Sequence, residues 1–357
     1  MKVSLSIKKV EGPFGGGAIF ANTVSDFLVS KGIEVVNDLN DKDIDIVLHV
    51  NPFPFLMQSS SYSFFNAFIY KLKHPKTIII QGIHECDERK GTHYMNKLLV
   101  NACNHADFVI FVASWLKPLL EKNGLDKDKP SQVILHGVPE EIFNTENKKF
   151  WDKKSKMKIV THHWGGQFLK GHDFYQRLDK LLGSSEFGDK FEFTYIGNYP
   201  KNLEYKNTKL ISPISGKELG DELKKHDLYI TGSRNEPAGM HHVEGALCGM
   251  PLLYIDSGAF KEYCEGYGLE FNEYNFEEKI MEMYRDYDMY VEKVKEYDRI
   301  SSKMGQEYYE SLTKLYKDRD KYAFRKEKKI GKIFFIRIYS FFYDKVWRVR
   351  RILRLLK

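Results

Sequence analysis

Glu236 and Glu244 stand eight positions apart in the part of this sequence that is richest in residues able to do chemistry. Glu236 falls in a loop behind an apolar, strand-like run, and Glu244 falls about one turn into the helical segment after that loop. Two carboxylates placed in this way can hold different hydroxyl-bearing parts of one ligand through charge-assisted hydrogen bonds, and a sugar nucleotide is such a ligand. The pair could equally be an acidic residue that favours a helix dipole and a solvated helical Glu.

The loop between the two carboxylates contains Ala238, Gly239 and Met240. A loop that leads from the carboxyl end of a parallel strand into a helix is where open α/β sheets bind ligands. The N–H groups of Gly239 and Met240 could contact a phosphate or sugar oxygen there. His241 and His242 follow, but adjacent residues on a helix point about 100° apart and cannot chelate one ion together. We therefore expect no metal at this position.

Two features of the first half of the chain also invite a functional interpretation. Gly16 and Gly17 close the glycine-rich stretch Gly12-Pro13-Phe14-Gly15-Gly16-Gly17, ahead of an apolar-periodic helix. Glycines there would let the backbone approach a phosphate, although a plain connecting turn explains them about as well. Their spacing is not GxGxxG, which disfavours a dinucleotide. His84 follows an apolar strand at its carboxyl end, where it could contact a sugar hydroxyl or an acceptor, or cap a local loop.

The elements that must position these residues follow an alternating pattern. Short β-branched runs alternate with longer amphipathic segments, which is typical of βα units that build parallel sheets, so the predicted fold class is α/β. The predicted strands are Val3–Ile7, Ile33–Val36, Ile44–Val50, Thr77–Gln81, Phe108–Val112, Gln132–Leu135, Lys158–Thr161, Glu192–Gly197, Lys209–Ile211, Leu228–Thr231 and Pro251–Tyr254.

The chain, with 357 residues of which 42% are apolar, is long enough for two domains. The strand pattern lapses in the Lys-rich stretch Asn144–Lys158, which we interpret as a linker. This places a first domain at residues 1–150 and a second at 151–325, with last helices that can cross back to the first domain. Residues 326–357 form a separate tail.

The tail is strongly basic. It holds eleven Lys/Arg and two Asp/Glu, a net charge of +9 in a chain whose total is +6. Apolar residues recur at helical spacing through residues 328–357, so we predict a basic, aromatic amphipathic helix on an anionic membrane surface. A helix packed on the protein's own core or on a partner is the alternative. No recognition module accompanies the charge, which argues against nucleic-acid binding.

The cysteines and the apolar runs bear on the cellular compartment. The four cysteines form no CxxC pair, so neither a disulfide framework nor a metal site is indicated. No run approaches the ~20 apolar residues of a membrane-spanning helix, and the start of the sequence lacks the long apolar segment of a secretory signal. We expect a cytoplasmic protein, peripheral on the inner face of the cell membrane through its tail.

A set of motifs, taken in order, resembles the retaining GT-B glycosyltransferases, close to glycosyltransferase family 4. The segment from Ser233 to Gly239 followed by Glu244 to Pro251 is similar to their E-x7-E signature. Further similar segments are Phe14-Gly15-Gly16-Gly17, Ala106–Ser114, Val133–Phe143 and Lys170-Gly171-His172-Asp173. The resemblance covers residues 3–265. It implies two Rossmann-like domains with parallel sheets facing a central cleft, the first holding the acceptor and the second a nucleotide-sugar donor.

The resemblance also implies roles for single residues. Lys170 pairs with the donor diphosphate, Glu244 holds the ribose hydroxyls, and Glu236 contacts the donor sugar together with nearby backbone N–H groups. Gly16 approaches the phosphates from the other domain, and His84 faces the reacting sugar. The implied reaction is metal-independent, uses no cofactor, and passes a sugar from a nucleoside-diphosphate sugar to a hydroxyl acceptor with retained anomeric configuration. The implied acceptor is a lipid-linked saccharide or a surface polysaccharide precursor.

One position departs from the family pattern. An Arg usually stands about five positions before the Lys, but here that place falls within Trp164-Gly165-Gly166. Arg234 is the predicted replacement because it lies in the matching loop, with His162 and His163 as alternatives. Two other functions stay open: a GT-B-like sugar-nucleotide epimerase, which would consume donor without an acceptor, and a catalytically silent binding subunit, which would turn over no donor.

Overall fold

The computed structural model describes residues 1–7, 16–53, 56 and 60–323, and contacts within it divide the chain into two compact units. Unit 1 contains β1 (Lys2–Leu5), residues 17–134 and residues 305–323, whereas unit 2 contains Gly16 and Leu135–Met304. The first residue of α1 (Gly16–Ser30) and the first four of α13 (Ser301–Lys317) therefore fall in unit 2, and the rest of both helices in unit 1. The predicted tail, residues 326–357, lies outside the described residues.

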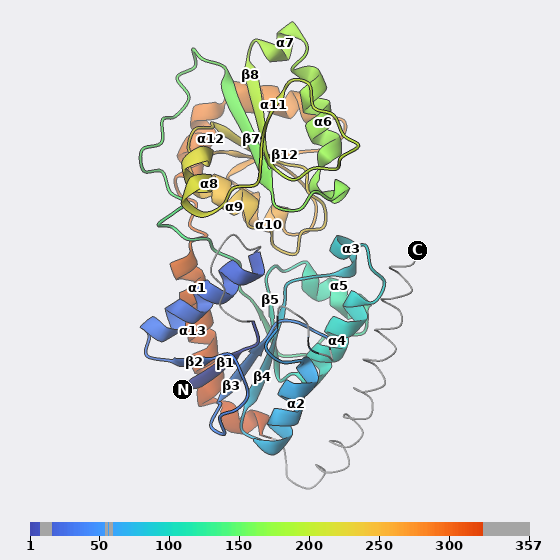
Figure 1. Cartoon of the computed structure of the whole chain (residues 1–357), viewed down its shortest axis with the longest axis vertical. Helices are drawn as coiled ribbons and strands as arrows, with labels where there is room; N and C mark the ends of the chain where they lie inside the picture. Colours follow the sequence, from blue (N-terminus) through green and yellow to red (C-terminus); the bar gives the residue numbers. More distant parts are fainter. Residues whose placement is uncertain (8–15, 54–55, 57–59, 324–357) are drawn as a thin grey trace. The chain divides into compact units, whose positions relative to one another are not determined.

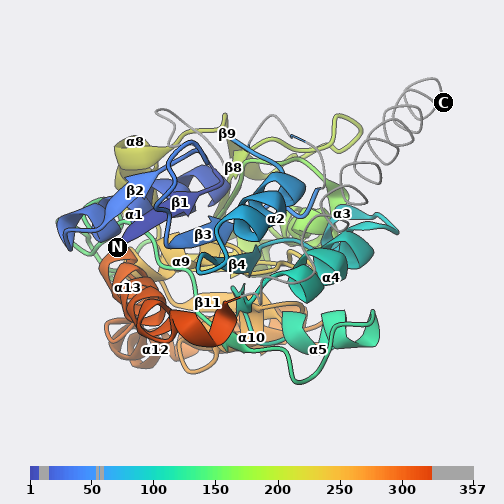
Figure 2. The same cartoon turned by 90° about the horizontal axis from the view of Figure 1, so that it is seen from below.

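Unit 1 is a parallel six-stranded sheet with helices on both faces. The sheet has the order β2-β1-β3-β4-β5-β6. Figures 1 and 2 show α2 and α4 on one side of it and α13 on the other. Its elements after β1 are α1 (Gly16–Ser30), β2 (Glu34–Val36), β3 (Ile46–His49), α2 (Phe64–Lys73), β4 (Ile78–Ile83), α3 (Asp87–Lys90), α4 (Met95–His105), β5 (Phe108–Phe111), α5 (Leu116–Lys122), β6 (Ser131–Val133), α13 (Ser301–Lys317) and η2 (Arg319–Tyr322).

Unit 2 is a second parallel six-stranded sheet, with the order β12-β11-β10-β7-β8-β9. Its elements are β7 (Met157–His163), η1 (Phe168–Lys170), α6 (His172–Leu181), α7 (Ser185–Gly188), β8 (Phe191–Gly197), β9 (Thr208–Ile211), α8 (Gly216–Leu223), β10 (Leu228–Thr231), α9 (His241–Leu247), β11 (Leu252–Ile255), α10 (Phe260–Cys264), β12 (Gly268–Phe271), α11 (Phe276–Arg285) and α12 (Tyr287–Val294).

The central strands of both units are buried on both faces. All residues of β3, β4, β10 and β11 are buried, as expected for parallel strands covered by helices on each side. The core of each unit therefore lies along its sheet.

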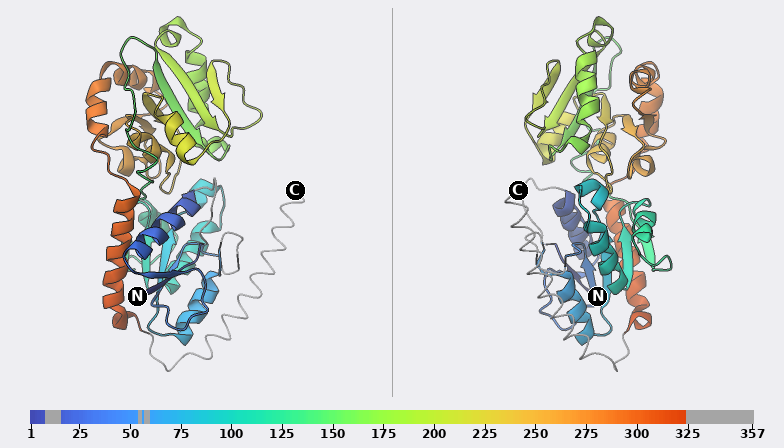
Figure 3. Two further views of the ribbon diagram at one scale, coloured as in Figure 1. Left: turned by 60° about the vertical axis from the view of Figure 1, so that its left-hand side comes forward. Right: turned by 90° about the vertical axis from the view of Figure 1, so that its right-hand side faces the viewer.

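The last long helix, α13, packs against α1 within unit 1, and Figure 3 shows it running along that unit. Gly305 permits the close approach, because a Cβ there would lie 2.3 Å from the ring of Phe27. One turn further on, the rings of Tyr308 and Phe20 meet with centroids 5.4 Å apart.

The predicted domain boundary and the observed division differ for residues 135–150, which the sequence analysis assigned to the first domain and which pack with unit 2. Val138 donates its N–H to the carbonyl of Arg299 at 3.1 Å. Just beyond, Trp151 is buried with its ring 4.7 Å from that of Tyr284. The Lys-rich composition indicated a linker, and within that stretch Trp151 packs on unit 2.

The α/β fold class is confirmed, and each of the eleven predicted strands overlaps an observed one. The twelfth, β12, is missing from the prediction. It pairs with β11 at the edge of its sheet, and only Phe271 of its four residues is buried, so it lacks the apolar run that marks the others. In the part of the chain that the structure describes, no helix combines the length and apolar character needed to cross a membrane.

Candidate functional site

Two neighbouring strands of unit 2 lead into the segments that carry the predicted donor residues. β7 and β10 are paired and parallel, with Tyr229 opposite Val160, so their carboxyl ends reach the same edge of the sheet. β7 continues through a loop into η1, which ends at Lys170. β10 continues through residues 232–240 into α9. The structure thus brings these segments together at the edge where open α/β sheets bind ligands.

Lys170 and Glu236 form an ion pair at this edge. The Lys170 Nζ lies 2.8 Å from Glu236 Oε1, and the two side chains are 16% and 8% exposed. The hydroxyl of Ser233 donates to the same Glu236 oxygen at 2.8 Å. Because both charges are largely screened from water, they attract each other more strongly than a surface pair would. An anionic ligand that reached Lys170 would compete with this carboxylate.

Backbone contacts hold the two segments at a fixed separation. The N–H of Arg234 donates to the carbonyl of Leu169 at 2.8 Å. Gly171 has a φ of 94°, and a Cβ on it would lie 2.4 Å from the carbonyl carbon of Gly232. Only glycine fits such a close approach in this backbone conformation. The position of Lys170 relative to the Glu236 loop is therefore built into the backbone.

Glu244, the second predicted carboxylate, is 6% exposed and is tied to β7. Its Oε2 lies 2.5 Å from Nε2 of His162. The His162 Nδ1 lies 3.1 Å from the hydroxyl of Tyr229, and this hydroxyl also accepts the His162 backbone N–H at 3.1 Å. Gly245 allows α9 to approach, since a Cβ there would lie 2.3 Å from the Tyr229 ring.

The guanidinium of Arg234 is bound by Asp173 of α6. Its Nη1 lies 2.9 Å from Oδ1 and its Nη2 lies 2.5 Å from Oδ2, and the group sits 5.3 Å from the ring centre of Phe174. A bidentate pair stacked on a ring has a specific geometry. Arg234 was predicted to replace the missing family Arg. To do so it must bind Asp173 and the donor at the same time, or release Asp173.

The other predicted donor residues occupy the turn before α9. Ala238 is buried, Gly239 has a φ of 74°, and Met240 is the half-buried N-cap of the helix. They lie in the same loop as Glu236, as predicted. Their proposed contacts with a ligand stay a prediction.

Four histidines near these carboxylates form a chain of ring contacts. The ring of His241 lies 6.2 Å from that of His162, 4.6 Å from His163 and 5.2 Å from His242. Burial lowers the pKa of His242 to about 3 and holds the pKa of His241 well below its ordinary value, so both are neutral near pH 7. Among the described residues, no group of three His, Cys, Asp or Glu is arranged to hold a metal ion. The predicted metal independence stays a prediction.

The remaining predicted site residues belong to the strands and helices of the amino-terminal half. His84 directly follows β4, and its ring packs 4.5 Å from that of Phe20 in α1. Gly16 and Gly17 are exposed in the first turn of α1. Their functional roles stay predictions.

Three partners at the unit 2 site escaped the sequence analysis. His162 was considered only as a replacement cation, but the structure binds it to Glu244. Tyr229 and Asp173 were assigned no role. These contacts join residues 61 to 82 positions apart, which no short motif encodes. Asp173 was visible three positions after Lys170, but nothing in the sequence indicates that it faces Arg234.

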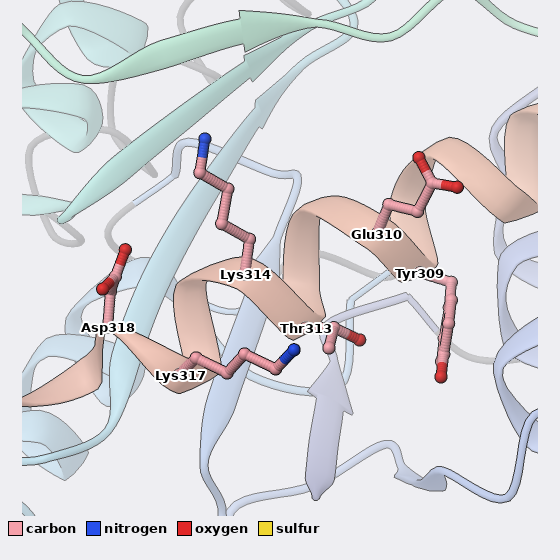
Figure 4. Close-up of a pocket in the computed structure, with 6 residues that line it drawn as sticks. All are labelled: Tyr309, Glu310, Thr313, Lys314, Lys317 and Asp318. Carbon is pink, nitrogen blue, oxygen red and sulfur yellow. The ribbon is translucent and has the colours of Figure 1, made fainter.

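A shallow hollow elsewhere, about 390 Å³ in volume, contains none of the predicted site residues. Figure 4 shows the six residues that line it, all from α13 and the turn after it: Tyr309, Glu310, Thr313, Lys314, Lys317 and Asp318. A hollow lined by one helix surrounds a ligand poorly compared with the concave sites that small molecules occupy.

Comparisons with solved structures identify the fold. Anabaena HepE in complex with UDP-glucose matches 88% of this chain and 100% of its own, with a TM-score of 0.64 and 13% identity. The sucrose-phosphate synthase of Thermosynechococcus elongatus matches 89% of this chain and 99% of its own, with a TM-score of 0.60 and 12% identity. The chain has the GT-B fold, which confirms the fold that the motifs implied.

Sequence comparisons are more limited in extent. No family model matches the chain. The phosphatidylinositol N-acetylglucosaminyltransferase GPI3 subunit of Saccharomyces cerevisiae is 28% identical over 185 residues. That match covers 47% of this chain and 40% of the relative, so the chain spans less than half the length of the curated relative that it matches.

Proposed function

We propose that this protein is a glycosyltransferase that passes a sugar from a nucleoside-diphosphate sugar to a hydroxyl acceptor, with retained anomeric configuration. The observation that carries the proposal is the buried Lys170–Glu236 pair at the carboxyl edge of unit 2, with Glu244 on the helix that follows the same loop. The GT-B fold supports it, as does the likeness to HepE, which was solved with UDP-glucose.

Lys170 has the chemistry that a departing nucleoside diphosphate requires. Negative charge develops on the diphosphate as the bond to the sugar breaks, and a cation fixed beside it stabilises that charge. On donor binding, the diphosphate takes the place of the Glu236 carboxylate on Nζ, which lies 2.8 Å away in this structure. Glu236 then contacts the donor sugar, together with the backbone N–H groups of Ala238, Gly239 and Met240. No metal ion or cofactor is required for these roles.

Glu244 accepts hydrogen bonds from the ribose hydroxyls of the donor. Its burial makes such charge-assisted bonds strong, because little water competes for the carboxylate. Arg234 supports the same site by holding the loop between β10 and α9 to Asp173, and by adding positive charge near the diphosphate.

The acceptor half of the reaction belongs to unit 1. His84 stands at the carboxyl end of β4, where it contacts the reacting sugar or the acceptor hydroxyl, and Gly16 and Gly17 let the α1 backbone approach the donor phosphates. We expect closure of the site to exclude water and favour transfer over hydrolysis.

We further propose that the acceptor is a lipid-linked saccharide or a surface polysaccharide precursor, met on the inner face of the cell membrane. The basic, aromatic residues 328–357 support this, since each cation near an anionic bilayer contributes about 1 kcal/mol. The relative from Saccharomyces cerevisiae is named for transfer to phosphatidylinositol. Deleting residues 328–357 should reduce binding to phosphatidylserine vesicles but not to phosphatidylcholine vesicles, and unchanged partitioning would contradict the membrane role.

The donor site is tested by a thermal-shift screen of the full chain against UDP, GDP, ADP, CMP and their sugar conjugates. A ligand that binds the native state raises its apparent stability. We expect one nucleotide to raise Tm selectively, and we expect Glu244→Ala to abolish that shift. The matched control is Glu218→Ala, an exposed glutamate of α8, which should keep it. A wild-type protein that responds to none of these nucleotides would contradict the proposal.

Turnover separates the proposal from its alternatives. A glycosyltransferase releases nucleoside diphosphate faster when a hydroxyl acceptor is present. A sugar-nucleotide epimerase would convert the donor without any acceptor, and a silent binding subunit would bind nucleotide and convert nothing.

A further inference from the structure

Glu244 is held by a hydrogen-bonded chain that begins in the core of unit 2. Tyr229 of β10 is fully buried, and burial raises the pKa of its hydroxyl well above the ordinary value, so the hydroxyl keeps its proton. That oxygen already accepts the backbone N–H of His162 at 3.1 Å. It also lies 3.1 Å from the ring Nδ1 of His162 and 3.5 Å from the His162 carbonyl oxygen, so Tyr229 contacts both the ring and the backbone of this residue.

The carboxylate of Glu244 indicates which ring nitrogen of His162 carries a proton. A carboxylate has no proton to give, so the nitrogen that faces it, Nε2, is the donor. Nε2–H faces Oε2 of Glu244 at 2.5 Å. Within the described residues, His162 is the one side chain that donates a hydrogen bond to this carboxylate, and it does so at Oε2.

Two packing features keep Tyr229 and His162 in place beside Glu244. The rings of His162 and Tyr229 meet edge to face, with centroids 5.6 Å apart and planes at 82°. Gly245 brings α9 onto the same tyrosine ring, at a distance that any side chain would prevent. Neither His162 nor Tyr229 is exposed to more than a tenth of its surface, so both are poorly placed to meet solvent.

We propose that His162 is a positioning residue for the nucleotide: held by Tyr229, it fixes one oxygen of Glu244 so that the other accepts from the ribose hydroxyls. The proposal rests on the proposed donor site. In this role His162 does not replace the missing family Arg at the diphosphate, because its Nε2 is bound to the carboxylate of Glu244. A carboxylate already held in one orientation loses less conformational entropy when a ligand binds. We therefore expect it to increase the difference in affinity between a ribonucleotide and its deoxy form.

The test compares ribose with deoxyribose in wild type and variants. Isothermal titration calorimetry is run with UDP, GDP, ADP and CDP, and with the 2′-deoxy and 3′-deoxy forms of each. A hydrogen bond to a charged group contributes about 1.5–3 kcal/mol, so wild type should prefer its ribonucleotide over at least one deoxy form by roughly tenfold or more.

Two substitutions at position 162 separate positioning from packing. In His162→Gln the amide nitrogen lies near the place of Nε2 and can still donate to Glu244, whereas the shorter amide of His162→Asn lies near Nδ1 and cannot reach it. We expect His162→Gln to keep most of the ribose preference and His162→Asn to reduce it to about threefold or less. In turnover, His162→Asn should raise KM for the donor and leave kcat nearly unchanged.

Tyr229→Phe keeps the ring but removes the hydroxyl that orients His162, so its ribose preference should fall between those of wild type and His162→Asn. It also serves as the test if His162→Asn does not fold, as judged by circular dichroism. Equal ribose preference in wild type, His162→Asn and Tyr229→Phe would overturn the inference while leaving the donor site standing. A wild-type protein that binds none of the four ribonucleotides would overturn the donor site itself.

Discussion

Each unit buries a lysine against a carboxylate, but at opposite edges of its sheet. In unit 1, Lys71 of α2 lies 2.5 Å from Asp107, the residue just before β5, and its side chain is 0% exposed. In unit 2, Lys170 lies 2.8 Å from Glu236, beyond the end of β10. The first pair therefore stands at the amino edge of a parallel sheet and the second at the carboxyl edge.

The two ion pairs differ in what surrounds them. Asp107 also accepts the N–H of Ile79 at 2.7 Å, and Lys71 also donates to the carbonyl of Tyr322 at 2.8 Å. These contacts join α2, two strands and η2, so the unit 1 pair is structural. The Lys170–Glu236 pair joins two loops at the edge where ligands bind. A buried ion pair thus indicates function only when its place in the fold is known.

The largest expected effect is on the stability of unit 1. Lys71→Met leaves Asp107 buried without its ion-pair partner, and breaking a buried pair in this way costs about 3–5 kcal/mol. Urea unfolding followed by circular dichroism measures the loss. The double variant Lys71→Met with Asp107→Leu should recover much of it, because it removes both charges.

The matched control is Lys76→Met, which removes a lysine that is 68% exposed and paired with Asp320. Exposed pairs contribute about 0–1 kcal/mol, so its free energy of unfolding should stay close to that of wild type. A Lys71→Met protein as stable as Lys76→Met would contradict the structural role of the unit 1 pair.

The next effect falls on activity in unit 2. Lys170→Ala should lower donor turnover by about 10²–10³-fold, the loss seen when one group that stabilises transition-state charge is removed. Its free energy of unfolding should fall by less than that of Lys71→Met, because Lys170 is partly exposed and Glu236 keeps its hydrogen bond from Ser233. Lys180→Ala, at an exposed position of α6, is the control and should have wild-type kinetics. Loss of stability with retained turnover would place Lys170 in the structural class of Lys71.

The third effect is a difference in acid sensitivity between the units. Burial lowers the pKa of His136 and His226 in unit 2 to about 4 and that of His242 to about 3, whereas in unit 1 burial lowers the pKa of His49 to about 4. Between pH 6.5 and about 4 the unfolded chain binds more protons at these positions than the folded chain. Stability is therefore full above pH 6.5 and falls as the pH drops.

Each such histidine lowers the free energy of unfolding by about 1 kcal/mol per pH unit below 6.5. Because unit 2 holds three of the four histidines named above, it should lose more stability than unit 1. Calorimetry at pH 7 and pH 5 checks this, with the unit 2 transition identified as the one that nucleotide shifts. If both transitions fall equally, the histidines of unit 2 do not carry the difference.

The sequence predicted much of the fold because apolar runs mark buried parallel strands whatever their partners are. The sequence predicted β10, all four residues of which are buried. It did not predict the edge strand β12, of which only one residue is buried. The division of the chain was harder to predict, because residues 135–150 join unit 2 through contacts with residues far away in the sequence, such as that of Val138 with Arg299.

The sequence predicted which loops hold the candidate site residues, but not which side chains contact one another there. The E-x7-E spacing and the Lys170 motif place their residues from local sequence, and the structure brings Lys170 and Glu236 within 2.8 Å. The bond between His162 and Glu244 spans 82 positions and depends on the register of β7 against β10 and on Gly245. Such contacts follow from packing, which a single sequence does not reveal.

The most direct test of the donor site is peptide-resolved hydrogen exchange of the full chain with and without the nucleotide selected by the screen. Binding at the carboxyl edge of unit 2 predicts slower exchange in peptides that cover residues 162–173 and 231–247, with little change around Lys71 and along α13. Slower exchange confined to α13, or no change in those two unit 2 segments, would contradict the account.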